Sequence, residues 1–401
     1  MVIAIVLTSA ATTVAAVTPA QAQRFIMPDF GTDQGWQGAR HPRLVVDITG
    51  DRRADVVGFG DTGVHTAVAT SDGQFAASFQ VSNDFAYDTG WRVEQHDRFV
   101  TDITGDGRAD IVGVSGEGVF TAVAIGGGWF GPKKQVAPGL SKATCTISKL
   151  ADANGDGRND LFCMRDARVE VALALGDGGF AARKPVTTVF PVHDILGRTT
   201  TFNVVDVTRD GRADILGTIT SNQGVVPQFL TLTSLGNGDY AAEEDGGAAF
   251  AMGASVVPDA IIDVSGDGFA DLIKFTDATR VARGRGDGTF AAFLGAIADF
   301  GFPTGWNPTS HLRLAADINA DGRGDVVGFG NPGVFTAAGR TNGTFEAPVR
   351  FASADFGRSS GWEVVDHPRF LADITGDGRP DIVGFKQAGM YTAVNQDGFF
   401  G

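Results

Sequence analysis

The sequence predicts an all-β protein, a seven-bladed β-propeller of four-stranded blades in which the N-terminal strand completes the last blade. Three observations predict this fold. An acidic nine-residue pattern occurs seven times, apolar segments of strand length flank each copy, and the two ends of the chain fit one blade. The copies recur every 50 to 57 residues, the spacing of one supersecondary unit. We expect one propeller domain at residues 23–401, preceded by a signal peptide at residues 1–22 whose evidence is given below.

Each unit contains four predicted strands. In the first unit, the apolar residues 44–46 precede the acidic loop and residues 56–59 follow it. Residues 63–68 alternate between apolar and polar types, which is typical of a half-exposed strand. An Asp-Gly turn at residues 72–73 then leads to a fourth strand at residues 76–81, because Asp-Gly supplies the positive φ of a tight hairpin.

The two ends of the chain predict closure of a ring. The last unit stops at residues 399–401, where its outer strand should begin. Residues 24–30 match the outer-strand register of residues 349–356 in the preceding unit. An N-terminal strand that completes the last blade would hide two strand edges. A solenoid needs no such closure, so this feature favours the propeller.

Residues 1–22 have the composition of a secretory signal peptide. Residues 2–17 are apolar or small, and residues 20–22 read Ala-Gln-Ala, which fits a small-residue cleavage site. The run is too short and too rich in Thr and Ala for a membrane span. The sequence therefore predicts a secreted, extracellular protein without a membrane span.

Composition narrows the classes of partner. The net charge is −15, and phosphate binding needs clustered Lys and Arg, so no nucleic-acid partner is expected. The 56 glycines without a collagen period are typical of all-β chains with many tight turns. Cys145 and Cys163 flank one acidic loop on adjacent predicted strands. Both a disulfide and two buried thiols agree with that placement.

The acidic loops are candidate calcium sites. Each has Asp at positions 1, 5 and 9 and Thr, Asn or Ser at position 3, so oxygen ligands fall on alternate residues. A hard cation that takes about six to eight oxygens fits this pattern, and the absence of His and Cys argues against zinc or copper. Up to seven structural Ca²⁺ ions would take the formal charge from −15 to about −1. The candidate ligands are Asp47, Thr49, Asp51, Asp55, Asp102, Thr104, Asp106, Asp110, Asp152, Asn154, Asp156, Asp160, Asp206, Thr208, Asp210, Asp214, Asp263, Ser265, Asp267, Asp271, Asp317, Asn319, Asp321, Asp325, Asp373, Thr375, Asp377 and Asp381.

A second motif precedes only four of the seven loops. It reads Asp-Phe, four residues, Gly-Trp, four residues, His, one residue and Arg. Because three units lack it, the motif indicates a ligand site more than a packing requirement. An aromatic ring beside an imidazole and a guanidinium suits a sugar pocket. The alternative is that Trp packs between blades and His bonds the backbone. The candidate ligand-binding residues are Trp36, His41, Arg43, Trp91, His96, Arg98, Trp306, His311, Arg313, Trp362, His367 and Arg369.

With both motifs present, residues 24–401 resemble the Psathyrella velutina lectin family, within the wider group of FG-GAP or VCBS calcium propellers. The resemblance implies calcium in the blades and N-acetylglucosamine, and also sialylated glycans, bound in pockets between repeats. It implies four intact pockets, in units six, seven, one and two, and lost pockets in units three to five. The expectation is a multivalent lectin domain for glycans that end in N-acetylated sugars.

Two other functions remain open from the sequence. One is a non-catalytic scaffold propeller that binds a protein partner. The other is a carbohydrate-active enzyme, such as a lyase or a dehydratase. The sequence contains no H-E-x-x-H or G-x-S-x-G motif and no isolated pair of carboxylates outside the acidic loops, so we expect no catalysis.

Overall fold

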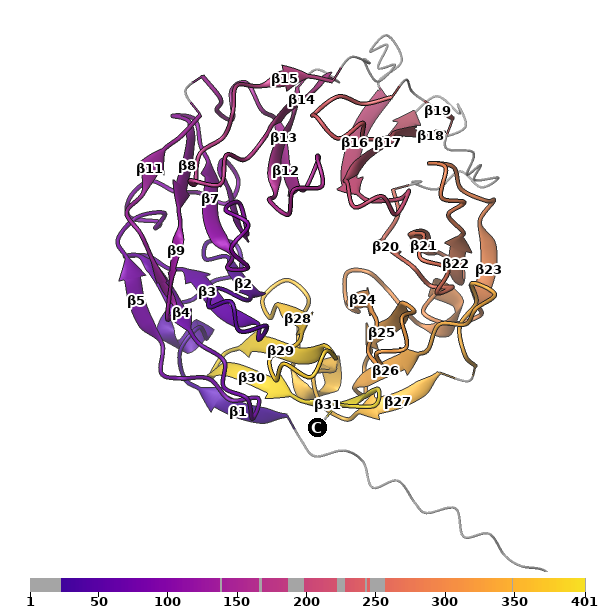
Figure 1. Cartoon of the computed structure of the whole chain (residues 1–401). Coiled ribbons are helices and arrows are strands. Elements are labelled where there is room, and N and C mark those ends of the chain that lie inside the picture. The colour runs from indigo at the N-terminus through magenta and orange to yellow at the C-terminus, as the bar shows by residue number, and fades with distance from the viewer. Residues whose placement is uncertain are drawn as a thin grey trace, which may run out of the picture.

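The computed structural model describes residues 23–137, 139–165, 168–186, 198–221, 228–241, 244–245, 257–347 and 349–400. The predicted signal peptide, residues 1–22, lies outside the described residues. Seven four-stranded antiparallel sheets form a ring, with the first strand of each unit nearest the centre (Figure 1). The predicted seven-bladed β-propeller is confirmed.

The blades take the following strands, from the centre outward. Blade one contains β2 (Arg43–Val46), β3 (Asp55–Phe59), β4 (Val64–Ala67) and β5 (Phe79–Ser82). Blade two contains β6 (Asp97–Thr101), β7 (Asp110–Val114), β8 (Val119–Ala122) and β11 (Lys134–Gln135). Blade three contains β12 (Ile147–Ala151), β13 (Asp160–Arg165), β14 (Arg168–Ala172) and β15 (Lys184–Pro185). Blade four contains β16 (Arg198–Val205), β17 (Asp214–Ser221), β18 (Gln228–Leu232) and β19 (Glu244–Asp245).

The remaining blades follow the same order. Blade five contains β20 (Ala260–Ile262), β21 (Asp271–Phe275), β22 (Thr279–Ala282) and β23 (Leu294–Ile297). Blade six contains β24 (Arg313–Ala316), β25 (Asp325–Phe329), β26 (Val334–Ala337) and β27 (Arg350–Ser353). Blade seven contains β28 (Arg369–Ala372), β29 (Asp381–Lys386), β30 (Gly389–Ala393) and β1 (Arg24–Met27). Two small hairpins add β9 (Ala124–Gly126) with β10 (Trp129–Phe130), and β31 (Asn395–Gln396) with β32 (Phe399–Phe400).

The N-terminal strand β1 closes the ring. It pairs antiparallel with β30, with Arg24 opposite Thr392 and Phe25 opposite Tyr391. The prediction that the N-terminal strand completes the last blade is therefore confirmed. The strand β1 thus lies in one sheet with β28, β29 and β30, close to the C-terminal end of the chain (Figure 1).

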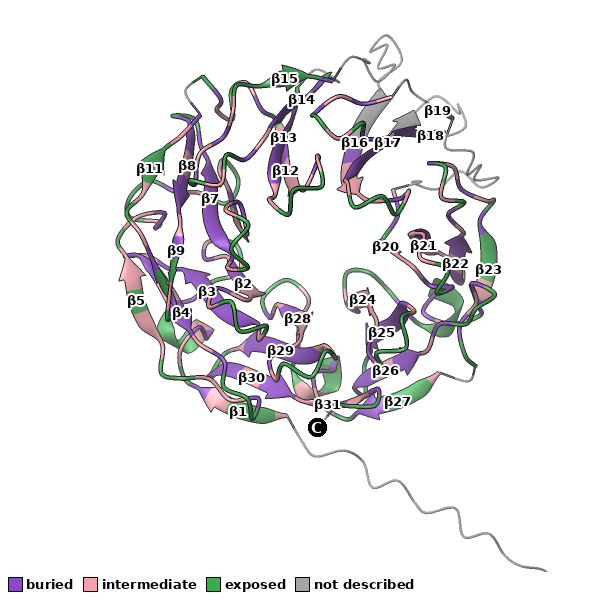
Figure 2. Cartoon of the chain, viewed as in Figure 1, coloured by how far each residue is buried: buried purple, intermediate pink, exposed green. Residues whose placement is uncertain are grey.

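The core lies between blades, because neighbouring sheets bury each other's faces. All five residues of β3 are buried. Val56 packs in one cluster with Val383 of blade seven, and Val57 packs in another with Ile111 of blade two. Burial is concentrated in the middle strands, and the outer strands are more exposed (Figure 2). A strand covered on both faces needs continuous apolar residues, which explains the Asp-Val-Val-Gly-Phe sequence of β3.

The structure joins Cys145 and Cys163 by a disulfide. Cys145 precedes β12, Cys163 lies in β13, and both are buried between blades two and three. The alternative of two separate buried thiols is not what the structure contains.

Candidate functional site

The first aspartate of each acidic loop organises the backbone of its own turn. In the first loop, Asp47 accepts hydrogen bonds from the backbone N–H groups of Thr49 at 3.0 Å, Gly50 at 2.7 Å and Arg52 at 2.7 Å. In the fourth loop, Asp206 accepts in the same way from Thr208, Arg209 and Gly211. These carboxylates accept hydrogen bonds from turn N–H groups that have no partner on a neighbouring strand.

The last aspartate of each loop is buried and joins the loop to the third strand of its blade. Asp55 accepts from the backbone N–H of Ile48 at 3.0 Å and from that of Ala69 at 2.8 Å. Burial raises the pKa of Asp55 to about 7. The same two bonds occur in every loop, and all seven residues are fully buried. They are Asp55, Asp110, Asp160, Asp214, Asp271, Asp325 and Asp381.

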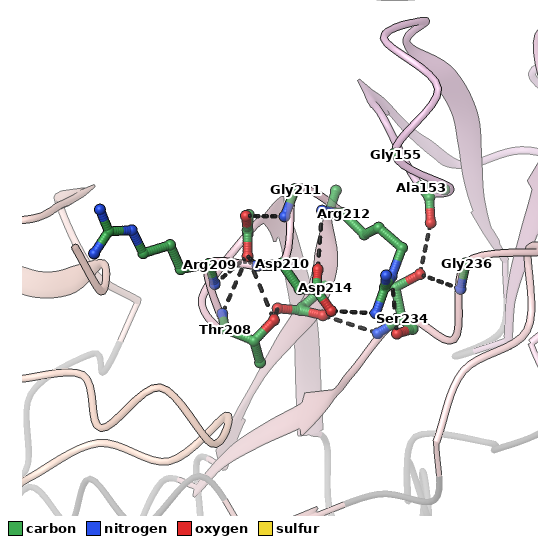
Figure 3. A network of polar contacts seen from close by, with 12 residues as sticks. Ala153, Gly155, Thr208, Arg209, Asp210, Gly211, Arg212, Asp214, Ser234 and Gly236 are labelled. Atoms are coloured by element: carbon green, nitrogen blue, oxygen red, sulfur yellow. Dashed lines mark hydrogen bonds and ion pairs between the residues drawn. The ribbon is translucent and has the colours of Figure 1, made fainter.

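The middle aspartate of each loop meets a guanidinium. In six loops the partner is the arginine two residues later. Figure 3 shows the fourth loop, in which Asp210 pairs with Arg212 and Asp214 accepts from the N–H of Ser234 at 2.8 Å. The Ser234 hydroxyl donates in turn to Ala153 of blade three at 2.6 Å. The six pairs are Asp51–Arg53, Asp106–Arg108, Asp156–Arg158, Asp210–Arg212, Asp321–Arg323 and Asp377–Arg379.

The candidate calcium ligands of these loops have protein partners in this structure. The carboxylates already face backbone N–H groups or a guanidinium, and the position-3 side chain of Thr49 lies 3.3 Å from Asp47. Among the described residues, no group of three or more His, Cys, Asp or Glu side chains is placed to hold a metal ion. Structural calcium at the predicted ligands stays a prediction.

The four Asp-Phe turns share an unusual backbone conformation. Phe30, Phe85, Phe300 and Phe356 have φ angles of 64°, 57°, 57° and 59°, the left-handed region. Such a conformation costs a bulky residue about 1–3 kcal/mol. Each ring is fully buried, and Asp29 holds its turn by accepting from the Phe30 N–H at 2.9 Å. The turn fixes where the following tryptophan lies.

The four predicted tryptophans are buried against a strand glycine. A Cβ on Gly58 would lie 2.6 Å from Cη2 of Trp36, so the indole occupies the space that a side chain would take. Gly113, Gly328 and Gly384 stand in the same relation to Trp91, Trp306 and Trp362. The exposed fractions of the tryptophans are only 0–7%. Trp36 Nε1 donates to Asp29 at 3.2 Å, and Trp306 Nε1 donates to Asp299 at 3.0 Å.

The four predicted histidines are held in one tautomer. Nδ1 of His41 accepts from the backbone N–H of Gln37 at 3.1 Å, and His96, His311 and His367 make the equivalent bond. The proton of the neutral ring is therefore on Nε2, as inferred from the network. In blade one Nε2 lies 2.9 Å from Asp61, and in blade six Nε2 of His311 lies 3.0 Å from Asn331. Burial lowers the pKa of His41, although its Nε2–H donates a hydrogen bond to Asp61, which acts in the opposite direction.

The predicted arginines lie behind the site and pack between blades. Arg43 is buried, donates to the backbone carbonyl of Phe30 at 2.8 Å, and lies over the ring of Phe385 in blade seven. Arg98, Arg313 and Arg369 also donate to their Asp-Phe turns and lie over a phenylalanine of the preceding blade. Burial lowers the pKa of Arg43 to about 10. None of these arginines lines either of the two cavities described next.

Two cavities bring the Trp and His of one unit together with residues that the sequence analysis did not select. In blade one the cavity has a volume of about 210 Å³, and in blade six about 250 Å³. Both lie between the segment that carries the Asp-Phe, Gly-Trp and His residues of the motif and the turn that joins the second and third strands of the blade. The first is lined by Asp29, Gln34, Gly35, Trp36, His41, Gly60, Asp61, Thr62 and His65. The second is lined by Asp299, Thr304, Gly305, Trp306, His311, Gly330, Asn331, Pro332, Phe335 and Val349.

The missed residues lie about 20 positions after each motif's histidine and differ in type between blades. Asp61 and Asn331 follow Gly60 and Gly330, so the shared glycine was the available signal. Each cavity combines a carboxylate, a histidine Nε2–H and an indole, and an oxygen acceptor lies within hydrogen-bond distance of that Nε2. This set can bind hydroxyl and amide groups on a compact, mostly neutral ligand.

Two comparisons with known proteins bear on this site. Residues 152–217 match an FG-GAP-like repeat. The chain is similar to the solved structure of an Agrocybe aegerita lectin, which recognises non-reducing terminal N-acetylglucosamine. The two are 32% identical, and the likeness covers 94% of this chain and 83% of that chain, with a TM-score of 0.53. This chain belongs to the family of that lectin.

Membership of this lectin family is therefore shown. The resemblance to the Psathyrella velutina lectin stays an expectation from the sequence. A component of the Photorhabdus luminescens Tc holotoxin pore shares the fold alone. The two chains are 15% identical, and the likeness covers 89% of this chain and 17% of the toxin component, with a TM-score of 0.51. No curated protein matches the sequence. Within the described part of the chain, no helix is long and apolar enough to cross a membrane.

Proposed function

We propose that this member of the lectin family is a non-catalytic protein that binds terminal N-acetylated sugars, N-acetylglucosamine first among them. The observation that carries the proposal is the repeated cavity of blades one and six, which combines Trp, a histidine Nε2–H and an aspartate. Hydroxyl and acetamido groups need both donors and acceptors, and the cavity offers both. Membership of a family whose relative recognises terminal N-acetylglucosamine adds independent support.

The charge of the cavities favours a neutral sugar. Asp29 and Asp299 each contribute a carboxylate, and neither cavity is lined by Lys or Arg. A sialic acid carboxylate would meet a like charge there. Sialylated glycans are therefore the second choice within the same proposal, to be tested beside the neutral sugar.

Secretion and multivalency belong to the proposal as well. The composition of residues 1–22 supports export, and two cavities on one rigid ring support binding of two sugars on one surface. Calcium is kept as a separate prediction, because the sugar cavities contain no residue of the acidic loops.

Titration calorimetry of the purified chain tests the proposal, with N-acetylglucosamine, glucose and sialic acid as ligands. We expect saturable heat with the N-acetylated neutral sugar and weaker heat with the others. The double variant His41→Ala, His311→Ala should abolish it, and Leu294→Thr on the exposed rim should not. Absence of binding by the wild-type chain to all three sugars would contradict the proposal and favour a protein partner.

A further inference from the structure

One position lies at the same place in each of the four blades that carry the Trp-His motif. It is the residue directly before the outermost strand. The strands are in matching register, since Phe79, Lys134, Arg350 and Arg24 each stand opposite a threonine of the third strand. The equivalent residues before them are Ser78, Lys133, Val349 and Gln23.

This position borders the aspartate of the Asp-Phe turn. In blade one the Ser78 hydroxyl donates to Asp29. In blade six Val349 lines the cavity beside Asp299 and Trp306. A serine or a valine at this position is short and uncharged. Blades one and six keep a cavity beside their tryptophan.

In blade two the position holds a long cation. The Lys133 ammonium pairs with Asp84 at 2.9 Å. The same ammonium lies 5.3 Å from the ring centre of Phe120. Phe120 occupies the third-strand position that His65 holds in blade one and Phe335 holds in blade six, and both of those residues line a cavity. Lys133 thus neutralises the carboxylate of this copy and extends over its ligand-facing wall.

In blade seven the position holds Gln23, which makes two hydrogen bonds. Its backbone N–H donates to Asp355 at 2.8 Å, and its side-chain carbonyl accepts from Trp362 Nε1 at 3.1 Å. In blades one and six that indole N–H goes to the aspartate instead. The Gln23 side chain is a primary amide, so its carbonyl offers the indole the same acceptor as the acetamido group of an N-acetylated sugar.

A second side chain covers the same copy. Lys386 occupies the position of Gly60 and Gly330, and its ammonium lies 5.6 Å from the ring centre of Trp362. It donates to the backbone carbonyl of Ser360. Trp362 is 0% exposed, whereas Trp36 and Trp306 are 6% and 7% exposed.

We infer that the residue before the outermost strand decides which copies of the motif bind sugar. Ser78 and Val349 leave blades one and six open, and Lys133 and Gln23 close blades two and seven with the chain's own groups. The inference rests on the proposed function and deepens it. The number of sugars bound per chain is then two, in place of the four that the motif count predicts.

The test reads each site separately through the tryptophan indole N–H signals in ¹H–¹⁵N NMR, during titration with N-acetylglucosamine. In the wild-type chain, Trp36 and Trp306 should shift while Trp91 and Trp362 stay fixed. Val349→Lys should silence Trp306 and leave Trp36 responsive. Lys133→Ser, which copies Ser78, should make Trp91 respond. The matched control is Lys134→Ser, one residue further along the same strand, which should behave as wild type.

Two outcomes would overturn the inference. A wild-type chain in which all four tryptophans respond would show that Lys133 and Gln23 do not close their copies. So would Val349→Lys with an undiminished Trp306 response, provided that the melting temperature shows an intact fold. No response by any tryptophan, in the wild-type chain or the variants, would instead remove the proposed function itself.

Discussion

Arg283 donates to Asp267 across 2.7 Å, and this pair takes the place of a contact that the fifth acidic loop lacks. The other six loops have arginine at position 7, but here the residue is Phe269. Arg283, just after β22, reaches the same carboxylate from the third strand. The position-5 aspartate therefore meets a guanidinium in all seven loops, even where the sequence position that normally supplies it has changed.

This exchange can be tested by moving the arginine. Arg283→Ala should lower the free energy of unfolding by up to about 1 kcal/mol, because the pair is partly exposed and screened by solvent. Adding Phe269→Arg should restore that loss. Urea denaturation midpoints measure both steps. A double variant no more stable than Arg283→Ala alone would argue against equivalence of the two arginines.

Chelation tests the calcium prediction at the loops. Three clustered carboxylates repel one another and a bound cation relieves that repulsion, so we expect a higher melting temperature in millimolar CaCl₂ than in EDTA. Seven ions at ten times their Kd would add about 1.4 kcal/mol each. An equal melting temperature in the two solutions would contradict structural calcium at the loops.

The histidine of the blade-one cavity should make stability depend on pH. Burial lowers the pKa of His41 below its unfolded value of 6.5, and the neutral ring is the form whose Nδ1 accepts from Gln37. Its stabilising contribution is therefore present above pH 6.5 and is lost as the pH falls through the lowered pKa. Unfolding free energies of wild type and His41→Ala should differ more at pH 7.5 than at pH 5. Equal differences at both pH values would contradict this.

The strand glycine under the tryptophan should tolerate no side chain. Gly58→Ala would place a Cβ 2.6 Å from Trp36 and 2.8 Å from Phe30, so we expect a loss of about 1–3 kcal/mol from overpacking. It should also weaken sugar binding at blade one. Gly295→Ala on β23 has open space around its Cβ and serves as the matched control. A Gly58→Ala chain as stable as this control would contradict the packing described here.

The sequence predicted the fold because its signals repeat and are local. Seven acidic loops set the number of blades, and the outer-strand register of residues 24–30 predicted that β1 completes blade seven. The sequence predicted the role of the second motif less completely. Trp36 and His41 do border a cavity, but Arg43 faces the preceding blade, because a single motif does not specify on which side of its strand each residue points.

The rest depends on contacts between separate segments. Asp61 and Asn331 come from the next turn of the chain, and Ser78 and Gln23 come from outer strands, one of them from the opposite end of the sequence. Four copies that match in sequence thus differ in what stands opposite them. A motif count treats such copies as equal, and their tertiary neighbours make them unequal.

The closing strand β1 also sets an order for synthesis. Arg24 is among the first residues of the propeller to be made, and its partner Thr392 is among the last. During translation β1 stays without its hydrogen-bonding neighbour until nearly the entire ring has been produced, and such unpaired strands are prone to aggregate. A chain cut short by premature termination would hold up to six blades and a dangling strand, which gives a protease or chaperone a direct way to recognise it.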